Sequence, residues 1–164
     1  MKCLRCGKST KRTVASTQSP YRFVESGLEH VYLSGIEVYV CPRCGSVHPV
    51  IPNISGLHQT VATALATKKG PLVGEEIRFL RKVAGLTAAK FAQLLLIKPE
   101  TLSRAENNHQ TLGPSLDKLA RAVAMEPIRP GIAKKILKSL IEQKQESPAQ
   151  LPLFSFDRGW KAAA

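Results

Sequence analysis

Residues 1–8 read MKCLRCGK and residues 39–46 read YVCPRCGS. These stretches contain all four cysteines of the chain, as two Cys-x-x-Cys pairs that are each followed by glycine. Two residues between thiols allow a tight turn to direct both sulfurs at one point, and glycine suits the end of that turn. Two such knuckles facing each other would supply four thiolates to one structural Zn²⁺ in a closed tetrahedral site. The expected ligands are Cys3, Cys6, Cys41 and Cys44.

Two other kinds of cysteine site remain as alternatives. An iron site of the rubredoxin type also suits the CPRCG stretch at 41–45. A redox-active dithiol is expected as one pair at a helix N-terminus, whereas this chain has two pairs with knuckle glycines. His48 could replace one thiol as a ligand, but four thiols are present, so we expect it to be a surface histidine.

The chain between the two cysteine pairs has the composition of short strands. YRFVES (21–26) and EHVYLSGIEVYVC (29–41) are rich in Val, Tyr and Phe, and Ser-Gly pairs interrupt them. We therefore expect a small antiparallel sheet that projects from the metal site. Residues 1–48 are predicted to form this four-cysteine zinc-finger module, and residues 49–72 a connector with at most one short helix.

Size and charge limit the kinds of protein that are possible. With 164 residues and only 5% aromatic side chains, two small domains fit better than one large core. The net charge of +12 favours a polyanionic partner, nucleic acid first. The excess charge is spread along the chain, so the total does not locate a binding surface. A chain kept soluble by excess lysine is the simpler alternative.

No targeting or membrane segment is recognisable. Basic residues recur through the first twelve positions, where a signal peptide would be apolar, and no apolar stretch reaches the ~18 residues of a membrane span. We expect a soluble cytoplasmic protein without a membrane partner. In that compartment paired cysteines are usually metal ligands or redox centres, not structural disulfides.

The pattern changes to helical periodicity after the connector. GEEIRFLRKVAG (74–85) has acidic residues in its first turn and ends at Gly85. LTAAKFAQLLLI (86–97) begins with Thr87, a good N-cap residue. Both stretches place apolar residues on one helical face, so two amphipathic helices are predicted.

Two more helices follow after short turns. KPETLSRAENN (98–108) places Pro99 at the first helical position, and GPSLDKLARAVAM (113–125) is amphipathic. Short helices with a three- or four-residue turn between the second and third predict a helix-turn-helix domain over residues 73–127. The residues expected to face inward are Ile77, Leu80, Arg81, Ala84, Ala88, Phe91, Ala92, Leu95, Leu102, Ala105, Leu116, Leu119, Ala120 and Val123.

The stretch LTAAKFAQLLLIKPETLSRAENNHQTLGPSLDKLARAV (86–123) resembles the XRE, or Cro/C1-type, repressor domain. With the amino-terminal cysteine pairs, the chain resembles MqsA-type antitoxins, which join a YgiT-type zinc finger to such a domain. The resemblance covers roughly residues 2–45 and 74–125. Leu96 stands where the family commonly has a turn glycine. The strongest matches are Thr87, Phe91, Ala92, Leu95, Ile97, Leu102, Ser103, Arg104, Glu106, Pro114, Ser115 and Leu116.

This resemblance implies an α+β fold and a DNA-binding function. The fold would be a small four-cysteine, zinc-binding β module followed by an all-α, lambda-repressor-like helix-turn-helix domain. The function would be that of a sequence-specific transcriptional repressor and the antitoxin of a type II toxin–antitoxin module. The zinc module would bind the toxin protein, and a homodimer would bind two operator half-sites about one helical turn apart.

In such a domain the third helix enters the major groove of double-stranded DNA. Glu100, Thr101 and Arg104 are then the candidates for reading base edges, by accepting from cytosine, touching thymine methyl and pairing with guanine. A salt bridge between Glu100 and Arg104 on a solvated face is the alternative. Glu106 is expected to be structural. The expected phosphate contacts are Lys90, Lys98 and Ser103.

Other functions are kept as alternatives. A solo XRE-type regulator without a toxin fits the same residues. The cysteine ribbon could itself bind RNA or DNA, with the helical half as a protein-interaction module. An enzyme is not expected, because no Ser-His-Asp arrangement, phosphate loop or paired carboxylate site is recognisable and the cysteines are used by the metal.

The carboxyl-terminal region, residues 128–164, lies outside the resemblance. An amphipathic helix is predicted to pack on the core, to mediate a dimer or to lie on an acidic surface. The last residues suit either a flexible tail with a short binding motif or a segment that docks on its own protein. The apolar positions of these two segments are Ile132, Ile136, Leu137, Leu140 and Ile141, and Phe154, Phe156 and Trp160.

Overall fold

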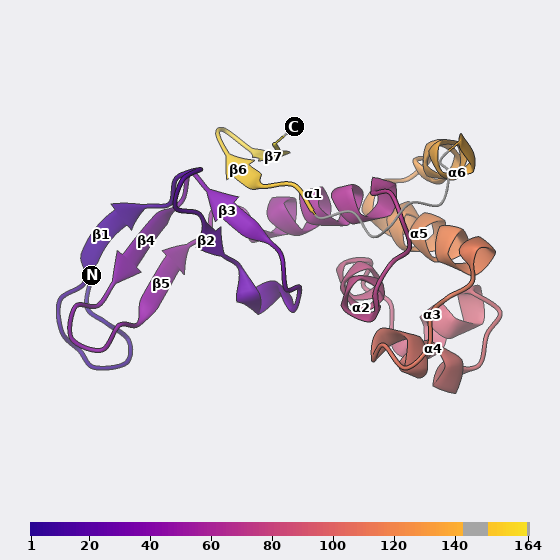
Figure 1. Ribbon diagram of the computed structural model, residues 1–164, viewed down its shortest axis with the longest axis horizontal. Coiled ribbons are helices and arrows are strands. Elements are labelled where there is room, and N and C mark those ends of the chain that lie inside the picture. The colour runs from indigo at the N-terminus through magenta and orange to yellow at the C-terminus, as the bar shows by residue number, and fades with distance from the viewer. Residues whose placement is uncertain (143–150, 164) are drawn as a thin grey trace.

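The computed structural model describes residues 1–142 and 151–163, except for the side chains of residues 139–142. It shows the predicted α+β fold, with strands and the four cysteines first and the helices after them (Figure 1). The molecule is elongated, and the first strands and the helices lie at its two ends (Figure 1). The predicted apolar side chains of Leu140 and Ile141 lie outside the described part.

A three-stranded antiparallel sheet lies next to the cysteines, in the order β1-β4-β5. Val40 pairs with Lys11 on one side and with Val47 on the other, so the ends of all three strands meet close to the two cysteine pairs. All four side chains of β1 are exposed, which leaves this sheet with a thin core. The strands are β1 (Lys11–Val14), β4 (Glu37–Val40) and β5 (Val47–Val50).

A second sheet joins the two ends of the chain, in the order β2-β3-β6-β7. Strand β6 runs parallel to β3 and places Phe154, which has no exposed surface, opposite Leu33. The indole Nε1 of Trp160 donates to the carbonyl of Pro52 over 2.9 Å. Residues 151–163 therefore dock on their own protein. The elements are β2 (Tyr21–Arg22), the 3₁₀ turn η1 (Val24–Ser26), β3 (Tyr32–Ser34), β6 (Phe154–Phe156) and β7 (Trp160–Ala162).

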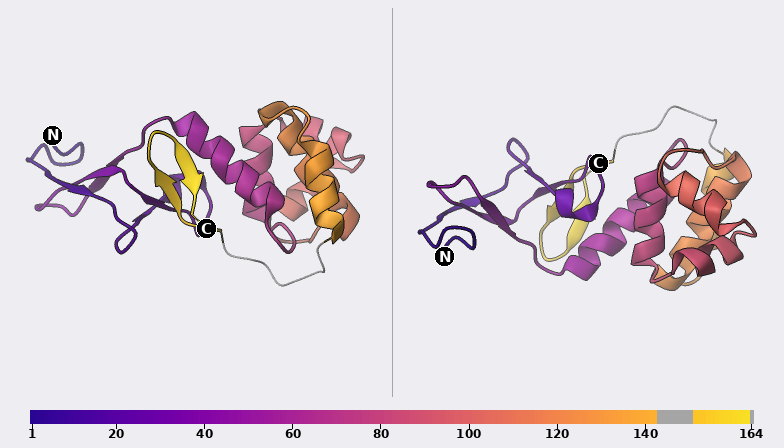
Figure 2. Two further views of the ribbon diagram at one scale, coloured as in Figure 1. Left: turned by 90° about the horizontal axis from the view of Figure 1, so that it is seen from above. Right: turned by 90° about the horizontal axis from the view of Figure 1, so that it is seen from below.

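Most of the predicted connector is a fourteen-residue helix, α1 (Ile54–Thr67), which packs against α2, α5, α6 and β7. Figure 2 shows α1 running from the second sheet into the helices. One continuous apolar core includes Phe23 of the sheet region and Leu57 of α1, and the His58 ring stacks on Phe23 and meets Phe79 edge-on. At most one short helix was expected in residues 49–72; α1 is a single helix there, but it has fourteen residues and buries Leu57, Val61 and Leu65.

The remaining helices form a compact cluster in which α2 packs on α4 and α5, and α3 on α4. Thr87 caps α3 as predicted, since its hydroxyl accepts from the Lys90 N–H over 3.2 Å. Pro99 and Pro114 occupy the first turns of their helices. The helices are α2 (Gly74–Val83), α3 (Ala88–Leu94), α4 (Pro99–Glu106), α5 (Pro114–Ile128) and α6 (Ala133–Glu142).

Two predicted core positions are exposed, and a charged pair is buried instead. Ala88 begins α3 at the surface, and Leu119 is 37% exposed. On α5 the inward face carries Asp117 and Arg121, which form an ion pair of 2.8 Å. Arg121, 1% exposed, also donates to carbonyls at the end of α1 and just after it, so α5 meets this end of α1 through polar groups.

Candidate metal centre and nucleic-acid interface

The two cysteine knuckles have the same backbone geometry. In the first, the Gly7 N–H donates to the Cys3 carbonyl over 2.9 Å, and in the second the Gly45 N–H donates to the Cys41 carbonyl over 3.0 Å. Both glycines are left-handed, with φ of 70° and 69°. A Cβ at either position would meet no atom within 4 Å, so glycine is favoured by backbone conformation and not by space.

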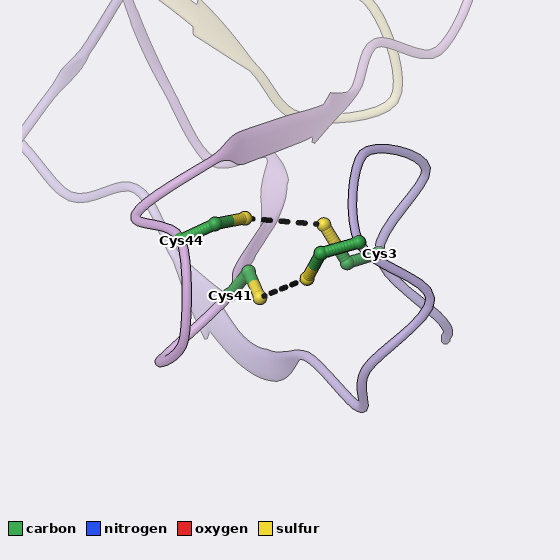
Figure 3. A group of neighbouring side chains, drawn as sticks. Cys3, Cys41 and Cys44 are labelled. Atoms are coloured by element: carbon green, nitrogen blue, oxygen red, sulfur yellow. Dashed lines mark hydrogen bonds between the residues drawn. The ribbon is translucent and has the colours of Figure 1, made fainter.

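The four predicted ligands lie together, and their sulfurs point toward one another (Figure 3). Cys3 Sγ is 3.6 Å from Cys44 Sγ, and Cys6 Sγ is 3.5 Å from Cys41 Sγ. All four ligand atoms lie within 4.8 Å of one another. A tetrahedral ion with metal–sulfur bonds of about 2.3 Å requires sulfurs about 3.8 Å apart. The cluster therefore has the dimensions of a site for one metal ion.

Two polar side chains surround the sulfurs. His48 Nε2 lies 3.5 Å from Cys3 Sγ, and Ser46 Oγ lies 3.2 Å from Cys44 Sγ. His48 was expected to be a surface histidine; it is half-buried on β5 and contacts the sulfur of Cys3. Its ring is placed to donate to a thiolate that already belongs to the four-sulfur set. Such outer contacts orient metal ligands and stabilise their charged form.

The thiols do not ionise independently of one another. The hydrogen bond with His48 lowers the pKa of the Cys3 thiol to about 5, and the hydrogen bond with Ser46 lowers the pKa of Cys44. At Cys6 a backbone N–H acts to lower the pKa, but burial and the neighbouring sulfurs outweigh it and raise the pKa to about 12. A cation among the sulfurs removes this conflict, because it favours all four thiolates at once.

The second candidate site is the α3–α4 pair at the opposite end of the molecule (Figure 1). The two helices are joined by residues 95–98. Leu95 is buried beneath the turn, whereas Leu96 is left-handed, with φ of 56°, and 90% exposed. Leu96 therefore takes the left-handed conformation that glycine usually supplies, although leucine at this position made that conformation doubtful from the sequence.

The back of α4 is fixed to α2 by charged groups. Both carboxylate oxygens of Glu106 accept from Arg81, at 2.6 and 2.9 Å, and Glu106 is only 7% exposed. This confirms the structural role expected of Glu106. Arg78 donates to the Glu106 carbonyl, and Asn108 accepts from the N–H of Gly74 over 2.6 Å. A Cβ on Gly74 would lie 2.5 Å from the Ala105 carbonyl oxygen, so α2 and α4 approach closely there.

The front of α4 is polar and open to solvent. Glu100, Ser103 and Arg104 are exposed, and Thr101 is half-buried. Among the described residues no ion pair joins Glu100 to Arg104, which leaves both charged groups available for another partner. Lys98 precedes α4 and is exposed, as is Lys90 on α3, whose Nζ donates to Gln93 over 3.2 Å.

Sequence reasoning missed the buried charges that connect α1 to the helix cluster. Lys68, 9% exposed, pairs with Glu76 at 2.7 Å, and Asp117 accepts from the Leu72 N–H over 2.8 Å. Arg121 donates to the carbonyl oxygens of residues 65, 66, 68 and 70. Asp117 lies one helical turn before Arg121, but the carbonyl groups that Arg121 meets are more than fifty residues earlier in the chain, so no local pattern in the sequence signalled that this charge is buried.

Comparison with protein families, with characterised proteins and with solved structures found no match to this chain. The class of protein is therefore defined by its own architecture: a four-cysteine β region followed by a helical region. Within the described residues, none of the helices has the length and apolarity that crossing a membrane requires.

Proposed function

We propose that this protein is a sequence-specific DNA-binding transcriptional repressor whose α4 enters the major groove. One observation carries the proposal: α4 has an exposed polar face, while its opposite face is fixed to α2 through Glu106 and Arg81. A helix that reads bases needs this arrangement, because its side chains must reach the groove from a rigid support. The net charge of +12 favours the approach to DNA.

The exposed residues divide into two roles. Arg104 pairs with guanine, Glu100 accepts from the cytosine amino group, and the Thr101 methyl touches thymine. Lys90, Lys98 and Ser103 contact phosphates and orient the domain without reading sequence. The two-fold symmetry of a homodimer would bring two α4 helices to half-sites about one helical turn apart.

The metal of the four-cysteine cluster is proposed to be one structural Zn²⁺. Four thiolates and no open ligand position are typical of structural zinc, and the left-handed knuckle glycines suit either zinc or iron. When bound, the ion neutralises half of the thiolate charge and joins the two knuckles. His48 and Ser46 then orient two of the thiolates by hydrogen bonding.

The biological role that the resemblance supports is that of an antitoxin acting in the bacterial cytoplasm. In this role the cysteine module binds and neutralises a toxin protein, while the helices repress the operon. Co-expression of the chain with the product of an adjacent small gene tests it. Rescue of growth by the full chain supports the antitoxin role, and absence of a toxic neighbour favours the solo regulator.

The base-reading roles are tested on duplexes selected from a random pool by the full-length protein. Arg104→Ala is expected to weaken binding to the selected duplex by about 1–3 kcal/mol and to relax the choice at one base pair. Lys98→Ala is expected to weaken selected and scrambled duplexes alike, and Lys82→Ala, an exposed position on α2, serves as control. Equal losses on both duplexes for Arg104→Ala would remove it from base reading.

A further inference from the structure

The end of the molecule opposite α4 has a concentrated positive charge. We define the knuckle tip as residues 1–12 and 41–46, which form the two cysteine turns and the first residues of β1. It contains no Asp or Glu. The basic residues of the knuckle tip, all of them exposed, are Lys2, Arg5, Lys8, Lys11, Arg12 and Arg43.

Most of this charge is not neutralised by the protein itself. Arg12 pairs with Glu37 across the β1–β4 ladder. Within the part of the chain that the structure describes, Lys2, Arg5, Lys8 and Arg43 make no ion pair. A zinc tetrathiolate carries a formal charge of about −2, so the tip stays positive when the metal is bound.

The two knuckles present an arginine at the same place. Arg5 in Cys-Leu-Arg-Cys and Arg43 in Cys-Pro-Arg-Cys both directly precede the second cysteine of their pair. Because the two turns share their hydrogen bonds and their left-handed glycines, their arginines leave equivalent backbone positions. Both guanidinium groups are thus attached to turns that a bound metal would make rigid, which would reduce the entropy lost when they bind a ligand.

We propose that the knuckle tip binds the phosphate backbone of nucleic acid, with Arg5 and Arg43 as its main contacts. A guanidinium donates two parallel hydrogen bonds to phosphate oxygens. Binding of unpaired basic side chains to a polyanion also releases the counterions condensed on that polyanion, which favours binding. A protein partner fits the knuckle tip itself less well, because interface centres are apolar and depleted of lysine, whereas the tip exposes six basic side chains and only Met1 and Leu4 as large apolar ones; the proposed toxin contact would use another face of the module. The contact is independent of base sequence and separate from α4.

The test measures the salt dependence of full-length protein binding to a scrambled duplex and to a single-stranded RNA. On duplex DNA, log affinity falls with log salt. Arg5→Ala combined with Arg43→Ala is expected to make this slope shallower by about 1.8, because two phosphate contacts are lost. Lys134→Ala combined with Lys135→Ala removes the same charge from exposed sites on α6 and should leave the slope unchanged. Arg5→Lys with Arg43→Lys keeps the charge and should retain most of the slope.

Zinc content and circular dichroism of each variant check that the knuckles remain folded. A shallower slope on RNA but not on duplex supports phosphate binding and identifies RNA as the nucleic acid that the knuckle tip binds. An unchanged slope on both nucleic acids, with metal retained, overturns the proposal. The result is independent of the repressor proposal, because Arg104→Ala alters the preference for the selected duplex and not the slope on scrambled DNA.

Discussion

The two ends of this protein are stabilised in different ways. At the cysteine end the sheet β1-β4-β5 has an exposed first strand and few buried apolar residues, and four sulfurs that could hold one metal ion lie within 4.8 Å of one another between its turns. At the helical end apolar side chains and buried ion pairs, such as Asp117 with Arg121, fix the helices. A small region without a core needs a metal, whereas a cluster of short helices can use ordinary packing.

Between the two ends, α1 and the carboxyl-terminal hairpin form a shared middle. Phe154 is buried beside β3, and Trp160 donates to the carbonyl of Pro52, shortly before α1. The core runs without a break from Phe23 to the helices through Leu57. Loss of the metal should therefore affect the first sheet and stop at this middle region.

Removal of the metal is expected to have the largest effect on the difference between the cysteine end and the helical end. Chelation is expected to remove hydrogen-exchange protection from residues 1–14 and 37–50, because binding of a structural zinc contributes roughly 10–16 kcal/mol to folding. Protection in α2 to α5 should remain. Hydrogen exchange read by mass spectrometry, with elemental analysis of the same sample, measures both. A metal-free protein whose first sheet stays protected contradicts the account of the cysteine end.

Substitution of the buried arginine of α5 is expected to have the second largest effect on stability. Arg121→Met leaves Asp117 and several carbonyl groups buried without their cation, which is expected to cost about 3–5 kcal/mol of the free energy of unfolding. Lys135→Met, at an exposed position of α6, removes the same charge and should cost little. Urea denaturation followed by the helical circular dichroism signal compares the two. A loss below about 1 kcal/mol for Arg121→Met would mean that the network is dispensable.

The smallest effect concerns the left-handed turns, which the two ends form with different residues. Gly7 and Gly45 supply this conformation at the cysteine end, whereas Leu96 adopts it between α3 and α4. Leu96→Gly is expected to stabilise the protein by about 0.5–1 kcal/mol, because the left-handed strain of about 1–2 kcal/mol exceeds the entropic cost of glycine. Leu94→Gly, at the last residue of α3 where the backbone is helical, should destabilise the protein by up to about 1 kcal/mol. Thermal unfolding of both variants gives the comparison, and destabilisation by Leu96→Gly would show that its side chain matters.

Much of the cysteine end was predictable because its signals are local. Thiol spacing and knuckle glycines follow from turn geometry within a few residues, and the structure has both glycines left-handed and all four sulfurs together. The role of His48 was not predictable, since it depends on the pairing of β4 with β5. This pairing places His48 opposite Tyr39 and brings the imidazole of His48 near Cys3.

At the helical end the caps and the inward positions Phe91 and Leu102 were predicted correctly, because N-cap chemistry and helical period act over short distances. The prediction that Leu119 faces inward was wrong, because the packing of α5 on α1 decides which face of α5 is buried. The inward face of α5 is turned so that Arg121 reaches the end of α1, more than fifty residues earlier in the chain. Periodicity predicts that one face is buried but does not predict a polar partner for it.

The sequence alone determined the four-cysteine site, the α+β class and the short helices of the carboxyl half, since spacing, capping and periodicity are properties of neighbouring residues. Only the tertiary structure decided that α1 is a packed helix, that β6 pairs in parallel with β3 and that charges are buried beneath α5. Strands of two or three residues carry no readable period, and the burial of Arg121 is decided only when the end of α1 packs on α5.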